Sequence, residues 1–532
     1  MELMRAAIND WQRLLGTDQV IIGDAVLRAY GMDASGVDRE IPAALRILDA
    51  ATVPRVMTIA HTHRVAVYPL STGHNWGYGT AMPVKDGCVI IDLSALQKIL
   101  HFDAEMGVVT VEPGVTQGML AEFLDAQNHP FMVPVTGAGP TCSLIGNALE
   151  RGYGITPYAD HFGAVTDLEA VLADGRLYRT ALREVGGEDL ARLFKWGIGP
   201  FAAGMFTQSG FGVVTRMSIV LARRPEAIKI CLFSLRDDTL LEAAVERIRR
   251  ILRDLPGTIG AINLMNRHRV LAMAAPFPGD RLGPDGLIPA EAMEALGRQY
   301  QVQPWTGFAT LYGTRRVVAA AQREVRTSLA GIASRVLFLT PRQSRALKRV
   351  AGRLPGAAGR RLASAAATLA SSLELAAGWP SETALPLAYW RNPDPPLGRW
   401  RDPSRDGCGL IWYAPLVPMR PLGVRAYVEM VKRVSLQHRS EPLITLTSIS
   451  DKLFDSTVPL LFDRRNPDAL RSARDCYHAM VDAGHSLGCF PYRLGVDAMK
   501  WAAGPDTDAG RFLTRLKKAL DPDDILAPGR YA

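Results

Sequence analysis

The chain has 532 residues, of which 48% are hydrophobic, and 61 Lys and Arg against 53 Asp and Glu give a formal net charge of +8. That length predicts about two to four domains, and the apolar fraction excludes a chain that is disordered throughout. The six cysteines stand singly, with no CxxC pair and no Cys/His cluster, so we expect neither a metal site nor a dense disulfide framework.

The N-terminal segment MELMRAAINDWQRLL is amphipathic and contains acidic residues, whereas a signal peptide needs an apolar core. No stretch of the chain approaches the roughly 20 uninterrupted apolar residues that span a bilayer. We therefore expect a cytoplasmic protein without an integral membrane segment.

Short β-branched runs punctuated by glycine predict a mixed α/β unit up to about residue 222. Thr116 is a candidate N-cap for a helix whose apolar positions begin at Met119. Leu168–Thr180 is expected as a hairpin that turns at Asp174 and Gly175. Three further segments are expected as strands: 88–93, 107–113 and 211–225.

From residue 223 to 477 the pattern changes to longer helices, interrupted strands and proline-rich joints, which predicts a second domain. It contains a basic insertion at about 341–380, whose first 21 residues hold seven cations and no acid. Without these seven the charges are nearly balanced. No aromatic residue lies among them to stack on bases, so we expect no nucleic-acid partner. A solvated, partly helical arm is the first interpretation, and peripheral contact with an anionic membrane through residues 342–361 is the alternative.

Residues 478–532 return to the Gly/Pro pattern of the first unit after a helix over Phe512–Leu520. Two glycine-rich loops in the first unit are the densest chemical signal. Residues 68–79 read YPLSTGHNWGYG, and residues 136–161 contain TGAGPTCSLIGNALERGYG. Such loops let consecutive backbone N–H groups converge on an anion. Neither is a Walker loop or a GxGxxG helix start, but the pair favours a large cofactor that carries phosphate.

Five segments, in this order along the chain, resemble the vanillyl-alcohol oxidase / p-cresol methylhydroxylase flavoprotein family: Ser71–Gly79, Val111–Thr116, Gly146–His161, Phe206–Thr215 and Pro528–Arg530. The resemblance implies an α+β fold. A two-part FAD-binding domain of the p-cresol methylhydroxylase (PCMH) type would span 1–222 and 478–532, and a cap domain of antiparallel sheet covered by helices would span 223–477. It also implies FAD, held by Ser71, Thr72, Gly73, His74, Asn75, Gly77, Pro113, Gly114, Cys142, Ser143, Gly146, Asn147, Gly152, Val213 and Arg530.

The family binds a para-substituted phenol as its phenolate with two tyrosines and one arginine, and the resemblance assigns these roles to Tyr78, Tyr492 and Arg493. One cation and two hydroxyl donors would lower the pKa of the phenol from about 10 towards neutrality. The anion then releases hydride from its para carbon to the flavin and becomes a quinone methide. Asp455 lies where the family carries active-site histidines, so it is a further catalytic candidate; a solvated carboxylate is the alternative.

The sequence departs from the family pattern at its cofactor linkage. Leu410 stands where a flavin-linking His or Tyr is expected, and it cannot form the bond. His74 and Cys142 instead resemble the berberine-bridge-type branch of the superfamily, in which a His and a Cys both bond to FAD. We therefore expect FAD attached bicovalently through His74 and Cys142. The alternatives are a hydrogen-bonded loop histidine and a small buried cysteine.

The resemblance implies oxidation of a para-substituted phenol, with dioxygen or another acceptor taking the electrons, by an enzyme that forms a homodimer. Val135 or Thr136 replaces the family aspartate that assists base or water chemistry, which disfavours hydration of the quinone methide. Loss of a neighbouring carboxylate or proton is then expected, that is, oxidative decarboxylation or desaturation, as in natural-product members of the family. The alternatives are a berberine-bridge-type sugar or alcohol oxidase and a non-catalytic flavin-binding protein.

Overall fold

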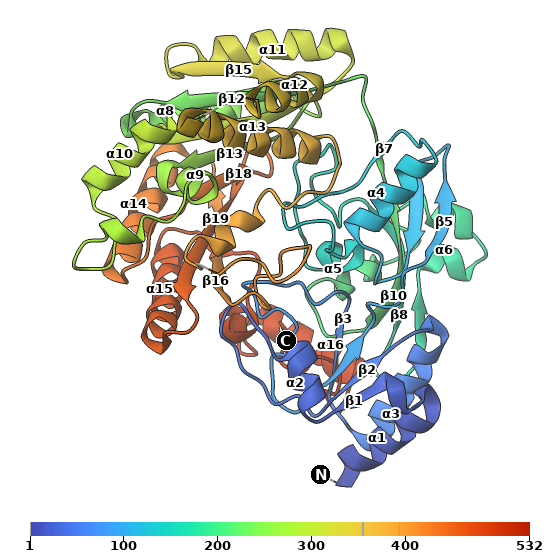
Figure 1. Ribbon diagram of the computed structural model, residues 1–532. Helices are drawn as coiled ribbons and strands as arrows, with labels where there is room; N and C mark the ends of the chain where they lie inside the picture. Colours follow the sequence, from blue (N-terminus) through green and yellow to red (C-terminus); the bar gives the residue numbers. More distant parts are fainter. Residues whose placement is uncertain (1, 354–355, 393, 532) are drawn as a thin grey trace.

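The computed structural model describes residues 2–353, 356–392 and 394–531, apart from several side chains in the helix Gly356–Ala376. The chain forms two domains, one built from its two ends and one from its middle (Figure 1). The first domain holds two larger sheets and a two-stranded pair, and the second, which we call the cap domain, holds one large antiparallel sheet. This is the α+β organisation expected from the sequence motifs.

The smaller sheet of the first domain has four strands in the order β1-β2-β4-β3, of which β2, β4 and β3 are parallel. Helices α1 and α3 pack on it, and the fully buried Trp11 of α1 donates its indole N–H to the carbonyl of Val56 at 3.1 Å. The elements are β1 (Val20–Ile22), β2 (Ala43–Arg46), β3 (Val67–Leu70), β4 (Val89–Asp92), α1 (Glu2–Leu15), α2 (Asp24–Tyr30) and α3 (Val53–His63).

The second sheet of this domain is antiparallel, in the order β5-β6-β10-β8-β9. Two local structures predicted from the sequence are confirmed in this region. Thr116 Oγ1 accepts the N–H of Met119 at 3.2 Å and caps α4. The hairpin of β8 and β9 turns at Gly175, whose φ is +86°. The elements are β5 (Ile99–Asp103), β6 (Val108–Val111), β8 (Val165–Val171), β9 (Leu177–Arg179), β10 (Val213–Val220), α4 (Gln117–Ala126), α5 (Leu144–Leu149), α6 (Ala181–Glu184) and α7 (Glu188–Ala191). A short pair, β7 (Phe131–Met132) with β11 (Ala222–Arg223), lies beside it.

The cap sheet follows the order β15-β12-β14-β13-β18-β19-β17-β20, with β16 also paired to β19. Four long helices share a hydrophobic core with it: α8 (Leu241–Asp254), α11 (Arg315–Leu329), α14 (Pro421–Gln437) and α15 (Pro467–Ser486). The strands are β12 (Ala227–Leu235), β13 (Ile259–Asn266), β14 (Trp305–Gly313), β15 (Arg335–Leu339), β16 (Cys408–Tyr413), β17 (Pro415–Pro418), β18 (Thr445–Ser448), β19 (Leu453–Asp463) and β20 (Phe490–Pro491); two shorter helices are α9 (Arg267–Ala274) and α10 (Ala290–Tyr300). Because β20 pairs with β17, the cap sheet continues beyond residue 477.

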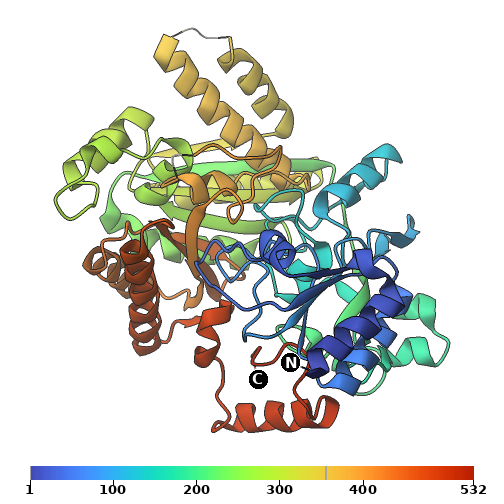
Figure 2. The same ribbon diagram turned by 60° about the horizontal axis from the view of Figure 1, so that its bottom comes forward.

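The basic insertion is a helical hairpin, α12 (Pro341–Ala351) and α13 (Gly356–Ala376), which projects from the cap domain (Figure 2). The end of α13 is anchored, because Leu373 and Ala376 pack with Ile230 and Phe308 of the cap sheet. Four cations of α12 are exposed and form no ion pair with any described residue: Arg342, Arg345, Lys348 and Arg349. The side chains of Arg360 and Arg361 lie outside the described part. The arm is therefore helical and its first helix is solvated, as expected.

The chain returns to the first domain through α16 (Asp508–Leu520). Lys517 of this helix is buried, and its ammonium group donates to Asp521 at 2.7 Å and to the carbonyls of Gly210 and Leu526 at 2.9 and 2.7 Å. These bonds join α16 to the C-terminal segment and to the loop that precedes β10. Within the described ranges, no helix combines the length and the apolarity that crossing a membrane requires.

Candidate functional site

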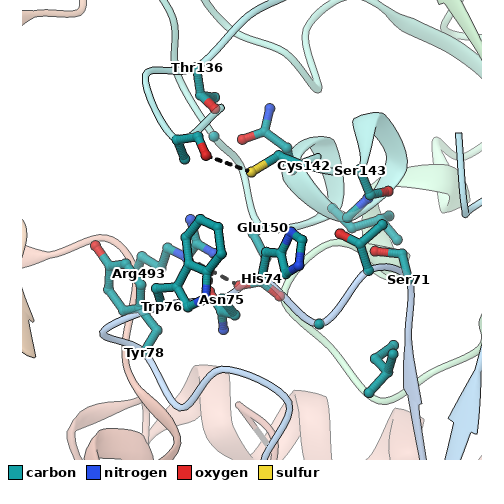
Figure 3. A pocket seen from close by; sticks show the side chains of 18 of the residues that line it. Ser71, His74, Asn75, Trp76, Tyr78, Thr136, Cys142, Ser143, Glu150 and Arg493 are labelled. Atoms are coloured by element: carbon teal, nitrogen blue, oxygen red, sulfur yellow. Dashed lines mark hydrogen bonds and ion pairs between the residues drawn. The ribbon is translucent and has the colours of Figure 1, made fainter. Parts of the chain in front are cut away.

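A cavity of about 450 Å³ lies between the first domain and the cap. The glycine-rich loop after β3, the loop that leads into α5 and the C-terminal segment line it from one side, and β16, β19 and residues 384–388 line it from the other. Figure 3 shows Tyr78 and Arg493 at one side of this space and Ser71 and Ser143 at the other. The cavity is therefore elongated along the two loops that the sequence singles out.

The loop after β3 presents an unused row of hydrogen-bond donors. The backbone N–H groups of residues 72–76 donate to no described residue, and the loop bends through Gly73 and Gly77 at φ of +68° and +78°. The two glycine-rich loops also approach closely: a Cβ atom on Gly146 would lie 2.5 Å from Ser71 Oγ. Consecutive free N–H groups in a glycine-rich cradle suit the diphosphate of a dinucleotide cofactor.

Glu150, just after α5, joins two buried arginines. Its Oε1 atom accepts a hydrogen bond from Arg530 Nη2, and its Oε2 atom lies 3.5 Å from Arg493 Nε. Arg530 also donates to the hydroxyl of Tyr68 at 2.8 Å. Two guanidinium groups share one carboxylate, so the cluster keeps a surplus positive charge inside the cavity. An anion bound beside it would be stabilised more strongly than at the surface, because the surroundings are desolvated.

Arg493 is held over the ring of Tyr78. Its Cζ atom lies 4.4 Å from the ring centroid, and its Nη2 atom donates to Asn75 Oδ1 at 2.5 Å. Burial lowers the pKa of Arg493, but the carboxylate of Glu150 and the hydroxyls of three neighbouring tyrosines together outweigh it and the pKa is raised, so the residue stays a cation. Burial raises the pKa of the Tyr78 hydroxyl, which therefore stays a neutral donor. The pair presents one fixed positive charge and one hydroxyl to the same space.

Asp455 of β19 and Tyr492 complete this end of the cavity. Asp455 is buried, and its Oδ1 atom has no hydrogen-bond partner among the described residues. Burial raises the pKa of Asp455 to about 7, although Arg493 and a hydrogen bond from Tyr492 lower it. Burial likewise raises the pKa of the Tyr492 hydroxyl. A carboxyl group with a pKa near neutrality can take up and return a proton at physiological pH. The solvated alternative for Asp455 is therefore wrong.

His74 and Cys142 both line the cavity, on the two loops. His74 stacks on Trp76 with ring centroids 4.6 Å apart, and Thr141 Oγ1, next to Cys142, lies 3.2 Å from His74 Nδ1. Burial lowers the pKa of His74, so its imidazole is neutral at pH 7 and keeps a nucleophilic nitrogen. Burial raises the pKa of Cys142 to about 12, and its thiol donates to the carbonyl of Ala138 at 3.4 Å.

Comparison with known proteins agrees with this geometry. Residues 42–181 match the family model described as an FAD binding domain. The chain is 33% identical to 1'-carboxy-chondrochloren decarboxylase of Chondromyces crocatus, over 99% of this chain and 97% of that protein. The chain belongs to the p-cresol methylhydroxylase / vanillyl-alcohol oxidase flavoprotein family. It is also 28% identical to the 4-cresol dehydrogenase [hydroxylating] flavoprotein subunit of Pseudomonas putida, over 98% and 94% of the two chains.

The whole fold is that of this flavoprotein family. Crystalline p-cresol methylhydroxylase with substrate bound superimposes with a TM-score of 0.86 and 26% identity, covering all of this chain and 97% of that one. The protein is thus an FAD-dependent oxidoreductase with a PCMH-type FAD-binding domain and a sheet-rich cap. FAD fits the described residues, because the free N–H groups of the first loop can meet its diphosphate and the elongated cavity runs along both loops.

All but three of the site residues expected of this flavoprotein line the cavity. A Cβ atom on Gly77 would lie 2.4 Å from Trp412, so this glycine lets the cap approach the loop. A Cβ atom on Gly114 would lie 2.2 Å from the carbonyl of Ser94, so this glycine permits a close backbone packing. The side chain of Val213 points into the core of the smaller sheet, and its neighbours Gly212 and Val214 line the cavity instead.

Two of the positions at which the sequence is expected to depart from the family pattern fall at the cavity. Leu410 of β16 lines it, and so does Thr136, whereas Val135 is buried in the core of the second sheet. Thr136 is therefore the residue that faces the cavity on the loop where the aspartate is missing. The carboxylates lining the cavity, among the described residues, are Glu150 and Asp455.

Sequence reasoning missed two residues of this flavoprotein site, Glu150 and Arg269. Glu150 stands inside a recognised motif, but its role depends on two arginines more than 300 residues away in the chain. Arg269 of α9 lines the cavity from the cap, 6% exposed. It belongs to no recognised motif, and its spacing from other residues in the sequence does not indicate a role.

Proposed function

We propose that the protein oxidises a para-substituted phenol by hydride transfer to FAD. The observation that carries this is the Arg493 guanidinium fixed 4.4 Å over the Tyr78 ring, in one cavity with Tyr492 and Asp455. These groups supply what phenolate binding requires: a permanent cation, hydroxyl donors and a carboxylate that can accept the phenol proton. The bound FAD supplies a two-electron acceptor.

Asp455 acts as the base for the phenol proton. Its carboxylate form removes the proton, directly or through the hydroxyl of Tyr492, while the surplus positive charge of the Arg493–Glu150–Arg530 cluster stabilises the phenolate. The electron-rich ring then expels hydride from the carbon attached at its para position, and the substrate becomes a neutral quinone methide. Asp455 holds the proton during this step and returns it when the aromatic ring reforms.

Oxidative decarboxylation is the outcome that the lining favours. On a 4-hydroxyphenylpropanoate, the C–C bond to the carboxylate breaks, its electron pair restores the aromatic ring, and carbon dioxide leaves a vinyl phenol. One hydride goes to FAD and the phenol regains its proton, so atoms and electrons balance. Thr136 faces the cavity where a carboxylate would activate water, which makes hydration slower. The similarity to a decarboxylase over nearly the full chain supports this assignment.

FAD is held covalently by His74 and Cys142 in this proposal. A neutral imidazole and a thiol line the cavity from two loops, and Thr141 links them through its contact with His74. Leu410 lines the cavity from β16 and offers no nucleophile. Because burial raises the pKa of Cys142 to about 12, its bond to FAD should form more slowly than the bond of His74.

Product analysis tests the proposed reaction. The holoenzyme is incubated with 3-(4-hydroxyphenyl)propanoate labelled in its carboxylate, and volatile and organic products are collected. Labelled carbon dioxide and 4-vinylphenol in equal amounts are expected. A hydroxylated product that retains the label would refute decarboxylation while leaving phenol oxidation intact.

A further inference from the structure

Arg269 is a buried cation for which the described residues provide no counter-ion. It lies in the first turn of α9, whose N-cap Asn266 accepts the N–H of Arg269 at 3.0 Å. Its Nε atom donates to Thr445 Oγ1 at 2.9 Å, and its Nη1 atom is buried without a hydrogen-bond partner among the described residues. Burial lowers the pKa of Arg269 to about 10, and no carboxylate opposes the effect.

The other cavity-lining arginines are paired, which makes Arg269 distinct. Arg493 and Arg530 both reach Glu150, whereas no described carboxylate forms an ion pair with Arg269. Burying a charge without a partner is unfavourable, so proteins retain such a group where a ligand completes it. The guanidinium lines the cavity, and its partner is therefore expected among the molecules that enter there.

The strand register relates Arg269 to the phenolate end of the cavity. Thr445, which holds Arg269, is paired with Thr457 on β19, and Asp455 stands two residues before Thr457 on the same face. Two residues of strand span about 7 Å. A phenol ring with a short side chain can bridge that span, with its oxygen near Asp455 and its far end near Arg269.

The cap contributes apolar side chains to the cavity. Trp412, Leu410, Leu387 and Ala388 line it, and the Arg269 Cζ atom lies 5.9 Å from the ring centroid of Trp412. These side chains suit an aromatic ring and methylene groups. The cavity thus combines two separate cationic groups, Arg493 and Arg269, with an apolar lining that the cap contributes.

We propose that Arg269 binds a carboxylate on the para side chain of the phenolic substrate. The planar guanidinium matches a carboxylate through two parallel hydrogen bonds. A carboxylate is preferred to a phosphate ester, because one guanidinium carries a single positive charge and balances a single negative charge. The inference rests on the proposed function for the identity of the ring and adds the specificity for an anionic side chain.

The pairing acts on binding more than on the chemical step. An ion pair present both before and during hydride removal lowers KM without raising kcat. Loss of Arg269 should therefore weaken the affinity for a carboxylate substrate strongly and change the limiting rate of flavin reduction little.

Calorimetric titration of the holoenzyme, with its flavin reduced beforehand and kept under nitrogen, tests the proposal without turnover. The probes are 3-(4-hydroxyphenyl)propanoate and its neutral amide, which differ in charge and hardly in shape. The wild type should bind the acid about 10- to 100-fold more tightly than the amide, and Arg269→Met should bind both about equally. Equal binding by the wild type, or a preference that survives in Arg269→Met, would overturn the proposal.

Two further variants distinguish the loss of the ion pair from a folding defect. Arg269→Lys keeps the charge but loses the planar fork, so an intermediate preference for the acid is expected, and an unchanged preference counts against the proposal. Arg391→Met is the matched control, since Arg391 is another cation of the cap whose pKa burial lowers, and it contacts the ring of Phe277 away from the cavity lining. It should keep the full preference of the wild type.

4-Ethylphenol separates this inference from the proposed function, because it has the ring and no carboxylate. Anaerobic bleaching of the flavin by 4-ethylphenol in both wild type and Arg269→Met would uphold the proposed function. The ratio of the affinities for the acid and the amide then tests the role of Arg269. If neither 4-ethylphenol nor the acid bleaches the wild type, the proposed function fails, and the calorimetric ratio still decides whether Arg269 is an anion site.

Discussion

The guanidinium of Arg493 lies 4.4 Å above the ring of Tyr78 and donates to Asn75 of the same loop. This relationship ties a C-terminal residue to the first glycine-rich loop, so that the loop facing the cofactor also positions the cation for the substrate. A phenolate bound there would lie against both groups.

Replacing Arg493 by Met should reduce the rate of flavin bleaching by phenols about 100- to 1,000-fold, because the phenolate loses its fixed cation in a desolvated site. FAD should stay bound. Anaerobic stopped-flow absorbance measures the rate, and the visible spectrum reports the flavin. Arg464→Met is the control: its guanidinium donates to the carbonyls of Asp33 and Ser404 outside the cavity lining and should leave the rate unchanged. Equal rates in Arg493→Met and wild type would remove Arg493 from the mechanism.

The pH dependence should report Asp455. Its carboxylate is the base, so kcat/KM should rise with pH through about 7, the value to which burial raises its pKa. Asp455→Asn should be slow and should lack this inflection. The free energy of unfolding gives a second readout. Because the folded pKa exceeds the unfolded one, the stabilisation from this group is complete below pH about 4 and is lost as pH rises through 7. An inflection that persists in Asp455→Asn would assign it to another group.

Flavin attachment should depend on two residues. Mass spectrometry of the acid-denatured protein should show one FAD bound to the wild type, one FAD still bound to His74→Ala and to Cys142→Ala, and none bound to the double variant. Cys476→Ala, a buried cysteine in the core of the cap, is the matched control and should retain the flavin. Release of free flavin by the wild type would disprove covalent attachment.

Removing the ammonium group of Lys517 should destabilise the protein. Lys517→Met leaves Asp521, which is 3% exposed, without its cation, and it removes bonds to two backbone carbonyls. We expect a loss of about 3–5 kcal/mol in the free energy of unfolding, measured by denaturant titration at pH 7. Lys518→Met, on the exposed side of the same helix, should change it by less than about 0.5 kcal/mol. Similar losses in both variants would contradict the role given to the buried pair.

The sequence predicted the parts of the site that lie in contiguous motifs. The loop from Ser71 to Gly79 and the pair Tyr492–Arg493 reach the cavity, because each occupies one local turn whose glycines or neighbours set its shape. The hairpin at Gly175 and the cap at Thr116 follow from residues within a few positions of each other. Such signals need no knowledge of tertiary pairing.

The rest depends on contacts between distant segments. Arg269 meets Thr445 across 176 residues, and only the pairing of β13 with β18 brings them together. The burial of Asp455 likewise follows from its position on an inner strand of the cap sheet. Side-chain direction along a strand alternates, so an error of one residue moves a position from cavity to core, as the contrast between Val213 and Val214 shows.

Anaerobic addition of 4-ethylphenol to the oxidised holoenzyme tests the central claim most directly, with its methyl ether as the paired probe. The phenol can form a phenolate and the ether cannot, although the two share the ring and the side chain. The account predicts complete bleaching of the flavin by 4-ethylphenol and no change with the ether. Bleaching by both, or by neither, would contradict oxidation through a phenolate held by Tyr78, Tyr492 and Arg493.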